Sequence, residues 1–217
     1  MNIEQARFNM IEQQIRPWDV LDKGVLGLLA IVRREEFVPA AYRALAFVDT
    51  EVPLGEGEFM LPPRVEARML QDLQVQRHER VLEIGSGSGF MAALLGHRAQ
   101  SVISLEVKPA LAKMATENLR RSGASNVSVV QADGVHGYAS EGPFDAIMLS
   151  GSVSKVPEDL LKQLKPGGRL LAIEGDEPVM AAVRYTANGD GTFGRVSLFD
   201  LDAPRLHGFV EPARFHF

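Results

Sequence analysis

Apolar and polar positions alternate in blocks along the second half of the chain, and each block predicts a strand or a helix. Short apolar runs predict strands, whereas apolar residues three or four positions apart predict helices. The predicted strands cover residues 81–84, 101–105, 127–130, 144–149 and 169–173. The helices predicted between them cover residues 89–96, 109–121 and 157–164. This βαβ repetition predicts an α/β fold, a Rossmann-like, doubly wound and mostly parallel sheet with helices on both faces.

The first 79 residues carry a different pattern, which predicts helices joined by an ordered connector. Two apolar faces with helical spacing come first, formed by Phe8, Ile11 and Ile15 and by Leu21, Val25, Leu28 and Leu29. Pro17 is expected to end the first of these helices. Residues 46–63 are rich in Pro, Gly and acidic residues and predict the connector. The prolines at 62–63 then open a helix through about Gln74, with inward side chains at Val65, Met69, Leu70 and Leu73.

The end of the chain departs from the βαβ pattern. Residues from 179 onward predict one more helix, a turn at 188–191 and a strand over 195–201. The turn rests on the sequence Asn-Gly-Asp-Gly, and a second turn, Lys-Pro-Gly-Gly at 165–168, leads into the last predicted parallel strand.

A glycine-rich loop at residues 85–89 follows the first of these strands. Glycine at alternate positions lets the backbone turn sharply and approach a ligand. A dinucleotide-binding loop, G-x-G-x-x-G, would need its third glycine where Phe90 stands, whereas here it is Gly89. The motif E-x-G-x-G-x-G that begins at Glu83 resembles the first motif of S-adenosylmethionine-dependent methyltransferases.

Polar residues also end the other predicted parallel strands, where ligands of open sheets bind. Glu106 is placed to accept hydrogen bonds from ribose hydroxyls, and Asp133 from an adenine amino group. Ser150 and Gly151 end the fourth strand, beside the expected methyl group. Alone, each is typical of a turn or a solvated strand end, but their joint order favours S-adenosylmethionine over NAD. The expected cofactor-binding residues are Glu83, Gly85, Ser86, Gly87, Ser88, Gly89, Glu106, Val107, Asp133, Gly134, Ser150 and Gly151.

Composition narrows the classes of protein that remain. The 217 residues carry a net charge of −5 without a basic run, which argues against nucleic acid as a partner. The absence of cysteine excludes disulfides, cysteine-ligated metals and a thiol nucleophile. No apolar run approaches about 20 residues and no signal peptide is evident, so we expect a cytoplasmic protein without a membrane partner. The five histidines lack metal-ligand spacing: His78, His97, His136, His207 and His216.

A longer resemblance lies outside the glycine loop. Arg-Arg-Glu-Glu-Phe-Val-Pro at 33–39, followed by Tyr42, Arg43, Asp49 and Pro-Leu-Gly at 53–55, is similar to the N-terminal region of protein-L-isoaspartate O-methyltransferases. The similarity continues through residues 81–89, 133–134, 143–147, 156–157 and 161–170, and so spans roughly residues 5 to 175. The resemblance implies methyl transfer from S-adenosylmethionine to the α-carboxyl of isoaspartyl residues in damaged protein, which leads through a succinimide to repair.

The resemblance breaks in one short segment. That family carries Thr-Ile-Ser-x-Pro-His before a helix, whereas this chain has Phe-Met-Leu-Pro-Pro-Arg at 59–64. The serine becomes Leu61 and the histidine Arg64, and both are candidates for the acceptor side. Arg64 is either a cationic contact for an acceptor carboxylate or part of a solvated helix start. Glu56 and Glu58 add negative charge nearby, which disfavours anionic acceptors.

Three functions therefore remain open: an isoaspartyl methyltransferase, a methyltransferase with another acceptor, and a donor-binding protein without catalysis. We expect residues 1–79 to form an N-terminal helical extension with the acceptor-side segment. Residues 80–217 are expected to form the S-adenosylmethionine-binding domain, packed with the extension into one compact unit. The last part of the chain, including Glu211 and Pro212, follows the family less closely and is a further candidate for acceptor recognition.

Overall fold

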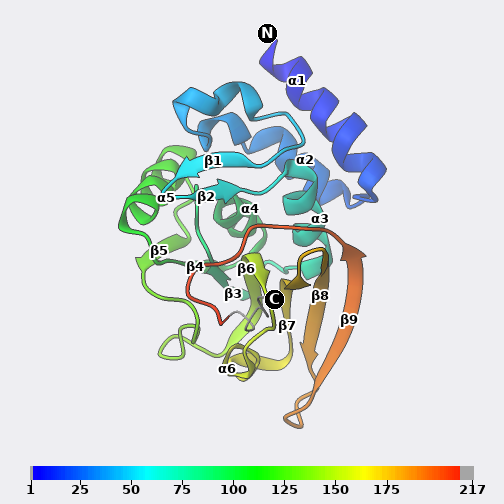
Figure 1. Cartoon of the computed structure of the whole chain (residues 1–217), viewed down its shortest axis with the longest axis vertical. Coiled ribbons are helices and arrows are strands. Elements are labelled where there is room, and N and C mark those ends of the chain that lie inside the picture. The colour runs from blue at the N-terminus through cyan, green and yellow to red at the C-terminus, as the bar shows by residue number, and fades with distance from the viewer. Residues whose placement is uncertain (1, 211–217) are drawn as a thin grey trace, which may run out of the picture.

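A seven-stranded sheet forms the centre of the molecule in this computed structural model, which describes residues 2–210 (Figure 1). Its strands are β3 Arg80–Ile84, β4 Ser101–Glu106, β5 Val127–Gln131, β6 Phe144–Val153, β7 Leu164–Asp176, β8 Val179–Ala187 and β9 Phe193–Asp200. They lie in the order β5-β4-β3-β6-β7-β8-β9. The first five strands in this order pair in parallel, whereas β8 pairs antiparallel with β7 and β9 antiparallel with β8. The predicted α/β, Rossmann-like fold with a mostly parallel sheet is confirmed.

Four helices cover the two faces of the sheet unequally. Their bounds are α3 Pro63–Leu73, α4 Phe90–Arg98, α5 Pro109–Ser122 and α6 Glu158–Leu161. Side chains alternate along β3, so Val81 packs in the core with α3, α4 and α5 while Leu82 packs in the core with α6. Because α6 is a single turn, it covers little of the sheet face on its side. Irregular segments cover much of that face instead, through side chains such as Tyr138, Leu206 and Phe209.

The strand order reverses beside β3. From β3 the chain crosses to β4 and β5 on one side, then returns to β6 and β7 on the other. Ile84 pairs with Leu105 of β4 and with Leu149 of β6, so these three strands end at one edge. This is the switch point at which open α/β sheets bind ligands.

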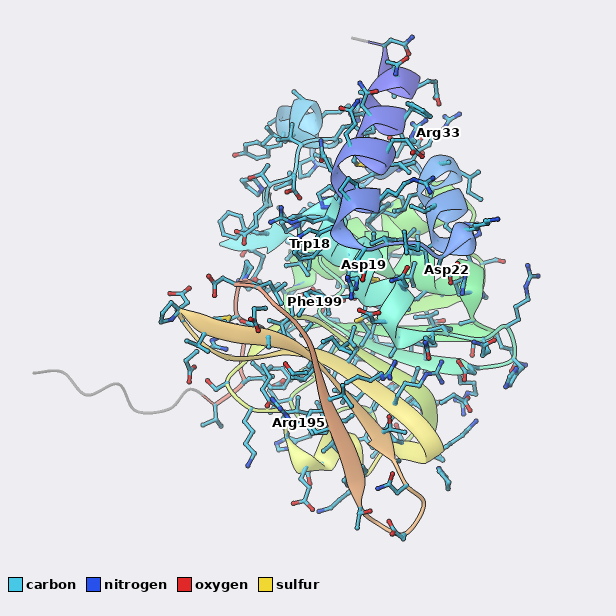
Figure 2. The ribbon with its side chains drawn as sticks, turned by 90° about the vertical axis from the view of Figure 1, so that its right-hand side faces the viewer. Trp18, Asp19, Asp22, Arg33, Arg195 and Phe199 are labelled. Carbon is cyan, nitrogen blue, oxygen red and sulfur yellow. The ribbon has the colours of Figure 1, made fainter. Side chains whose placement is uncertain are left out.

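The N-terminal segments pack over the α3–α4 side of the sheet (Figure 1). Helix α1, Ile3–Asn9, continues through a π-helical stretch, Met10–Ile15, and a 3₁₀ turn, Arg16–Trp18. Helix α2, Lys23–Ile31, precedes two 3₁₀ turns, Arg34–Glu36 and Ala40–Leu45. The Trp18 ring meets Phe199 of β9 edge to face, with ring centroids 5.2 Å apart (Figure 2).

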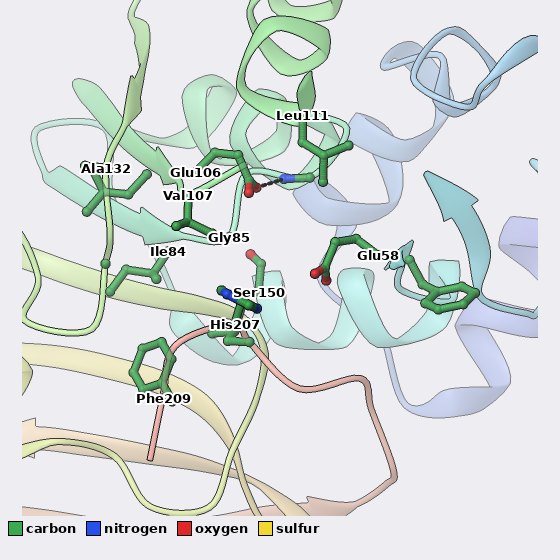
Figure 3. A pocket seen from close by; sticks show the side chains of 15 residues that line it. Glu58, Ile84, Gly85, Glu106, Val107, Leu111, Ala132, Ser150, His207 and Phe209 are labelled. Carbon is green, nitrogen blue, oxygen red and sulfur yellow. Dashed lines mark hydrogen bonds between the residues drawn. The ribbon is translucent and has the colours of Figure 1, made fainter. Parts of the chain in front are cut away.

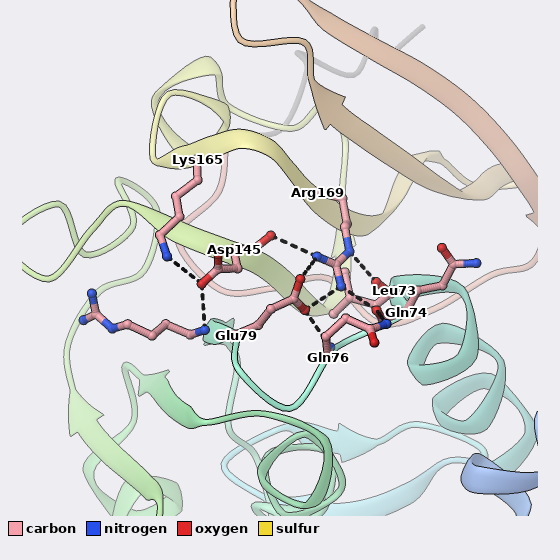
Figure 4. A network of polar contacts seen from close by, with 8 residues as sticks. Leu73, Gln74, Gln76, Glu79, Asp145, Lys165 and Arg169 are labelled. Atoms are coloured by element: carbon pink, nitrogen blue, oxygen red, sulfur yellow. Dashed lines mark hydrogen bonds and ion pairs between the residues drawn. The ribbon is translucent and has the colours of Figure 1, made fainter.

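A polar network fixes the end of α3 to the sheet (Figure 4). Arg169 of β7 donates to the carbonyls of Leu73 and Gln74 at 2.7 and 2.6 Å, and its guanidinium pairs with Glu79 at 2.5 Å. Asp145 accepts from the Arg80 backbone amide and from Lys165, both at 2.8 Å. The acceptor-side segment that precedes α3 is therefore carried on a helix anchored at its far end.

Two apolar side chains predicted to face inward are exposed. Phe8 is on the outside because π-helical bonding over Met10–Ile15 changes the angular spacing between Phe8 and the buried Ile11 and Ile15. Leu21 is outside because α2 begins only after it, with Asp22 as the N-cap. The remaining predicted inward residues of α2, which are Val25, Leu28 and Leu29, are buried, and so are all four predicted inward residues of α3. The helical periodicity predicted for these two helices is confirmed to that extent.

Three predicted elements have a different structure. The connector at 46–63 contains a hairpin of β1, Val52–Gly55, and β2, Glu58–Met60. The helix predicted from residue 179 is wrong, since this stretch is β8, paired residue by residue with β7. Single-sequence periodicity is ambiguous for a run such as Val-Met-Ala-Ala-Val, and an available strand edge decides the outcome. The predicted turn at 165–168 is an irregular part of β7, at a register shift between β6 and β7.

Within residues 2–210 there is no helix with the length and apolar character needed to span a membrane. The cytoplasmic location stays a prediction. Glu211, Pro212 and His216 lie outside the described residues.

Candidate functional site

A pocket opens beyond the carboxyl ends of β3, β4 and β6 (Figure 3). Four further segments complete its walls: the β1–β2 hairpin, the start of α5, the segment after β5 and a C-terminal segment after β9. Its lining residues are Glu58, Phe59, Ile84, Gly85, Gly87, Leu105, Glu106, Val107, Leu111, Ala132, Gly134, Ser150, Leu206, His207 and Phe209. Six of the predicted cofactor-binding residues are among them: Gly85, Gly87, Glu106, Val107, Gly134 and Ser150.

The glycine loop is held against the end of β4. The backbone amides of Gly85 and Ser86 donate to the Leu105 carbonyl at 2.9 and 3.1 Å. Gly89 caps α4 at a φ of 84°, and a Cβ there would lie 3.2 Å from the backbone of Ala115. Glycine tolerates both the positive φ and the close approach to Ala115. Gly89 therefore lets the loop turn sharply and pack closely on α5.

Glu106 connects the glycine loop to the β1–β2 hairpin. Its carboxylate accepts from the Gly87 amide at 2.9 Å and from the Lys108 amide at 3.0 Å. The Lys108 ammonium pairs in turn with Glu58 at 2.6 Å and donates to the Glu56 carbonyl. Lys108 thereby compensates the charge of Glu58, one of the two glutamates of the predicted acidic edge.

Glu83 is completely buried at the floor of the site. One carboxylate oxygen accepts from the Ser150 hydroxyl at 2.7 Å and the other from the Ser104 hydroxyl at 2.6 Å. Ser104 also lies 2.5 Å from the hydroxyl of Ser86. Burial raises the pKa of the Glu83 carboxyl to about 7, against the lowering effect of these hydroxyl donors.

A second pocket adjoins the first and shares Phe59, Gly85, Gly87 and Ser150 with it. Its polar lining comprises Glu66, Glu83, Ser86, Ser88 and Ser150, and its apolar lining comprises Leu54, Phe59, Met60, Leu61, Phe90 and Met91. The α3 segment and the hairpin thus face the glycine loop across a small space. The predicted acceptor-side segment lies beside the predicted donor-side loop.

The two acceptor-side candidates are placed differently. Leu61 is buried and lines the second pocket, and its carbonyl accepts from Arg34 at 2.7 Å. Arg64 lines neither pocket: its guanidinium pairs with Asp49 at 2.5 Å and stacks over Trp18 at 4.6 Å. Arg64 is therefore neither a free cation facing the second pocket nor a simply solvated helix start. It is paired with Asp49 and stacked on Trp18.

The predicted residues after β5 and at position 151 differ in their exposure. Asp133 is exposed and is not among the residues lining either pocket, and its carboxylate accepts from the Val135 amide at 3.0 Å. Gly134 approaches Ile84 so closely that a Cβ would lie 2.5 Å from its Cγ2 atom. Gly151 packs against Leu206, and a Cβ on Gly151 would lie 2.9 Å from the Leu206 Cγ atom.

Three lining residues come from a segment that carries no motif: Leu206, His207 and Phe209. This segment is held by Ser152, whose amide donates to the Pro204 carbonyl at 2.8 Å and whose carbonyl accepts from the Leu206 amide at 2.9 Å. The Ser152 hydroxyl adds a bond to the Ala203 carbonyl at 2.8 Å. No local pattern in the sequence marks this long-range pairing, so sequence reasoning missed these residues.

The site fits an adenosyl-amino acid better than a metal ion. No group of three His, Cys, Asp or Glu side chains in residues 2–210 is arranged to hold a metal. By contrast, the Glu106 carboxylate beside the pocket suits ribose hydroxyls, and Gly134 adds no side chain to the pocket wall. Glu83 supplies a carboxylate to the adjoining pocket, where an ammonium group would be compensated.

A sequence model of the protein-L-isoaspartate(D-aspartate) O-methyltransferase family, PCMT, matches residues 5–195. The chain belongs to this family. Two relatives named protein-L-isoaspartate O-methyltransferase illustrate how far the similarity to PCMT proteins extends. The protein of Methanoculleus marisnigri is 41% identical over 171 residues, 79% of this chain and 78% of that one. A protein of Syntrophobacter fumaroxidans is 37% identical over 205 residues, 93% of this chain and 96% of that one.

Solved PCMT structures share the fold. The crystal structure of the Plasmodium falciparum PCMT protein in complex with S-adenosyl-L-homocysteine superposes with a TM-score of 0.78. It covers 95% of this chain and 98% of its own, at 22% identity. A second protein-L-isoaspartate O-methyltransferase gives a TM-score of 0.77 over 93% of this chain and 66% of its own, at 24% identity. The shared fold thus covers nearly the whole of this chain.

Proposed function

We propose that this chain transfers the methyl group of S-adenosylmethionine to the α-carboxylate of isoaspartyl residues in proteins or peptides. The observation that carries the proposal is the family match over residues 5–195, which includes both the glycine loop and the segment that faces it. Relatives of 37–41% identity that bear the isoaspartyl methyltransferase name support this acceptor over a different one. They also support an enzyme over a binding protein without turnover.

The donor is proposed to bind in the pocket at the ends of β3, β4 and β6. Glu106 accepts from the ribose hydroxyls, and Gly134 borders the adenine ring, with Asp133 near its amino group. The glycine loop receives the methionine part, whose ammonium group approaches Glu83 and Ser150. In this arrangement residues 80–217 supply the donor side and residues 1–79 the acceptor side of one compact unit.

The reaction needs alignment more than acid–base chemistry. A carboxylate oxygen attacks the methyl carbon, the carbon–sulfur bond breaks, and its electron pair stays on sulfur. The products are a methyl ester and S-adenosylhomocysteine, and no proton moves, because a carboxylate is already ionised near pH 7. The chain's part is to orient the two reactants in line and to exclude water from the nucleophile. The apolar lining by Leu61, Phe90 and Met91 suits that task.

An isoaspartyl-peptide assay tests the proposal. The protein is incubated with saturating S-adenosylmethionine labelled in its methyl group, and base-released methanol is measured with an isoaspartyl peptide. The same peptide with normal aspartate serves as the control. Methanol release that depends on the isoaspartyl linkage is the expected result. Release no greater than with the control peptide, although the donor binds, would contradict the proposed acceptor.

Leu61→Ser is expected to raise isoaspartyl methylation about fivefold per folded molecule. A hydroxyl at this position would face the second pocket and donate to the acceptor carboxylate, a bond worth about 1 kcal/mol. The same change removes buried apolar volume, so the free energy of unfolding should fall by about 2 kcal/mol. Rates are therefore compared after the folded fraction is measured by circular dichroism. Unchanged or lower activity of the folded variant would mean that the acceptor is held by other groups.

A further inference from the structure

Glu83 has no cationic partner among the described residues. The two groups that bond to its carboxylate are neutral hydroxyls, Ser104 on β4 and Ser150 on β6. A buried carboxylate in such surroundings is expensive to ionise, since neutral donors replace only part of its hydration. The described residues therefore leave a negative charge at this position uncompensated.

The charged groups around Glu83 do not compensate its negative charge. On β4, Glu106 acts on Glu83 as a like charge and adds to the upward shift of its pKa. On the α3 side of the second pocket stands Glu66, and its carboxylate is already paired with the buried Arg34. From β6 and the glycine loop, the neutral hydroxyls of Ser150 and Ser86 bond to this cluster. A proton is the simplest source of neutrality.

The hydroxyl network can accommodate that proton. Ser104 and Ser86 lie 2.5 Å apart, and either oxygen is able to act as donor. Ser104 can thus donate to Ser86 while its own oxygen accepts from a protonated Glu83. When Glu83 is ionised, Ser104 turns its hydroxyl to the carboxylate instead. Both protonation states keep every hydroxyl bonded.

We propose that Glu83 is largely protonated in the free protein below neutral pH, and that binding of S-adenosylmethionine releases this proton to solvent. The donor's ammonium group then takes the place of the proton as the partner of the Glu83 carboxylate. The balance is one proton lost from the carboxyl group and one cation gained, with no covalent step. This inference rests on the proposed function only in requiring that the donor binds here.

The sign of the pH dependence follows from this exchange. Below the pKa of Glu83, the donor must displace a proton, so its affinity rises with pH by up to about tenfold per pH unit. Above that pKa the carboxylate is already ionised and this contribution levels off. Because the pKa of Glu83 is raised to about 7, the dependence should lie between about pH 5 and 7. An ordinary glutamate would confine it to pH values near 4.

Calorimetry in buffers of different ionisation enthalpy counts the released protons directly. S-adenosylmethionine is titrated into the full-length protein at pH 6 in at least two such buffers, because the donor's own amino group is fully charged there. We expect about 0.9 proton released per donor bound for a carboxyl group of pKa about 7. Affinity should drop about tenfold between pH 6 and pH 5.

Two variants separate Glu83 from its neighbours. Glu83→Gln should bind the donor without buffer-dependent heat and with an affinity that is flat over this pH range. Glu106→Gln retains Glu83 and should still release a proton, even where its affinity is lower. If Glu83→Gln fails to fold, infrared difference spectra of the unchanged protein should show a neutral carboxyl band that disappears on donor addition.

The outcomes distinguish the two proposals. Donor binding at pH 6 without proton release, or proton release that persists in Glu83→Gln, overturns the role of Glu83 and leaves the methyltransferase proposal standing. No donor binding at any pH overturns the proposed function itself.

Discussion

Glu106→Ala is expected to weaken S-adenosylmethionine binding about 10- to 150-fold. Hydrogen bonds to a charged group are worth about 1.5–3 kcal/mol, and the ribose hydroxyls would lose theirs. The Gly87 amide would lose its acceptor as well, which loosens the glycine loop in the free protein. Titration calorimetry of the donor with the purified variant gives the affinity directly.

The matched control for this variant is Glu117→Ala. Glu117 lies on the exposed side of α5 and lines neither pocket, so its removal changes the net charge equally. Its donor affinity should equal that of the unchanged protein. Equal affinities for both variants would show that Glu106 does not carry the ribose contact. A similar drop in both would point to long-range charge effects instead.

The second large effect is expected for Arg34→Met, which should lower the free energy of unfolding by about 3–5 kcal/mol. Arg34 is buried, and its guanidinium pairs with the buried carboxylate of Glu66. It also donates to the carbonyls of Ala46 at 3.0 Å and Leu61 at 2.7 Å. Methionine leaves the Glu66 charge and both carbonyls without that partner. Thermal unfolding should shift downward by roughly 6–20 °C for a chain of this size.

Two comparisons make the Arg34 result specific. Arg33→Met removes the neighbouring arginine, which is exposed and pairs with Glu36 at 3.2 Å, and should cost at most about 1 kcal/mol (Figure 2). The double variant Arg34→Met with Glu66→Met removes both charges and should recover much of the loss. A double variant no more stable than Arg34→Met alone would assign the loss to the Ala46 and Leu61 carbonyls rather than to the stranded carboxylate.

Local patterns were sufficient for the parallel strands and the glycine loop at the first pocket. The apolar run of β3 and the alternate glycines after it are contiguous signals: the run marks a buried strand, and the glycines allow the sharp turn that follows it. The parallel order followed from the βαβ repetition, because connections of this kind bring strand ends to one edge. The acid at position 106 could thus be expected at that edge before any coordinates.

Elements that depend on distant partners could not be predicted in the same way. Residues 179–187 are strand β8 because β7 offers a free edge, and the sequence Val-Met-Ala-Ala-Val is compatible with either structure. Phe8 is exposed because a π-helical stretch follows it. Arg64 forms an ion pair with Asp49 and stacks on Trp18, and both residues are far from it in the chain.

The sequence by itself determined the fold class, the family and six of the residues that line the first pocket, because motifs and periodicity are local. Only the tertiary structure decided their surroundings. It brought Leu206 and Phe209 to the pocket through pairing with Ser152, and it gave Glu58 a cation in Lys108. Within residues 2–210 it also surrounded Glu83 with hydroxyls and no cationic partner. Burial and charge compensation depend on segments distant in sequence, and no local pattern encodes them.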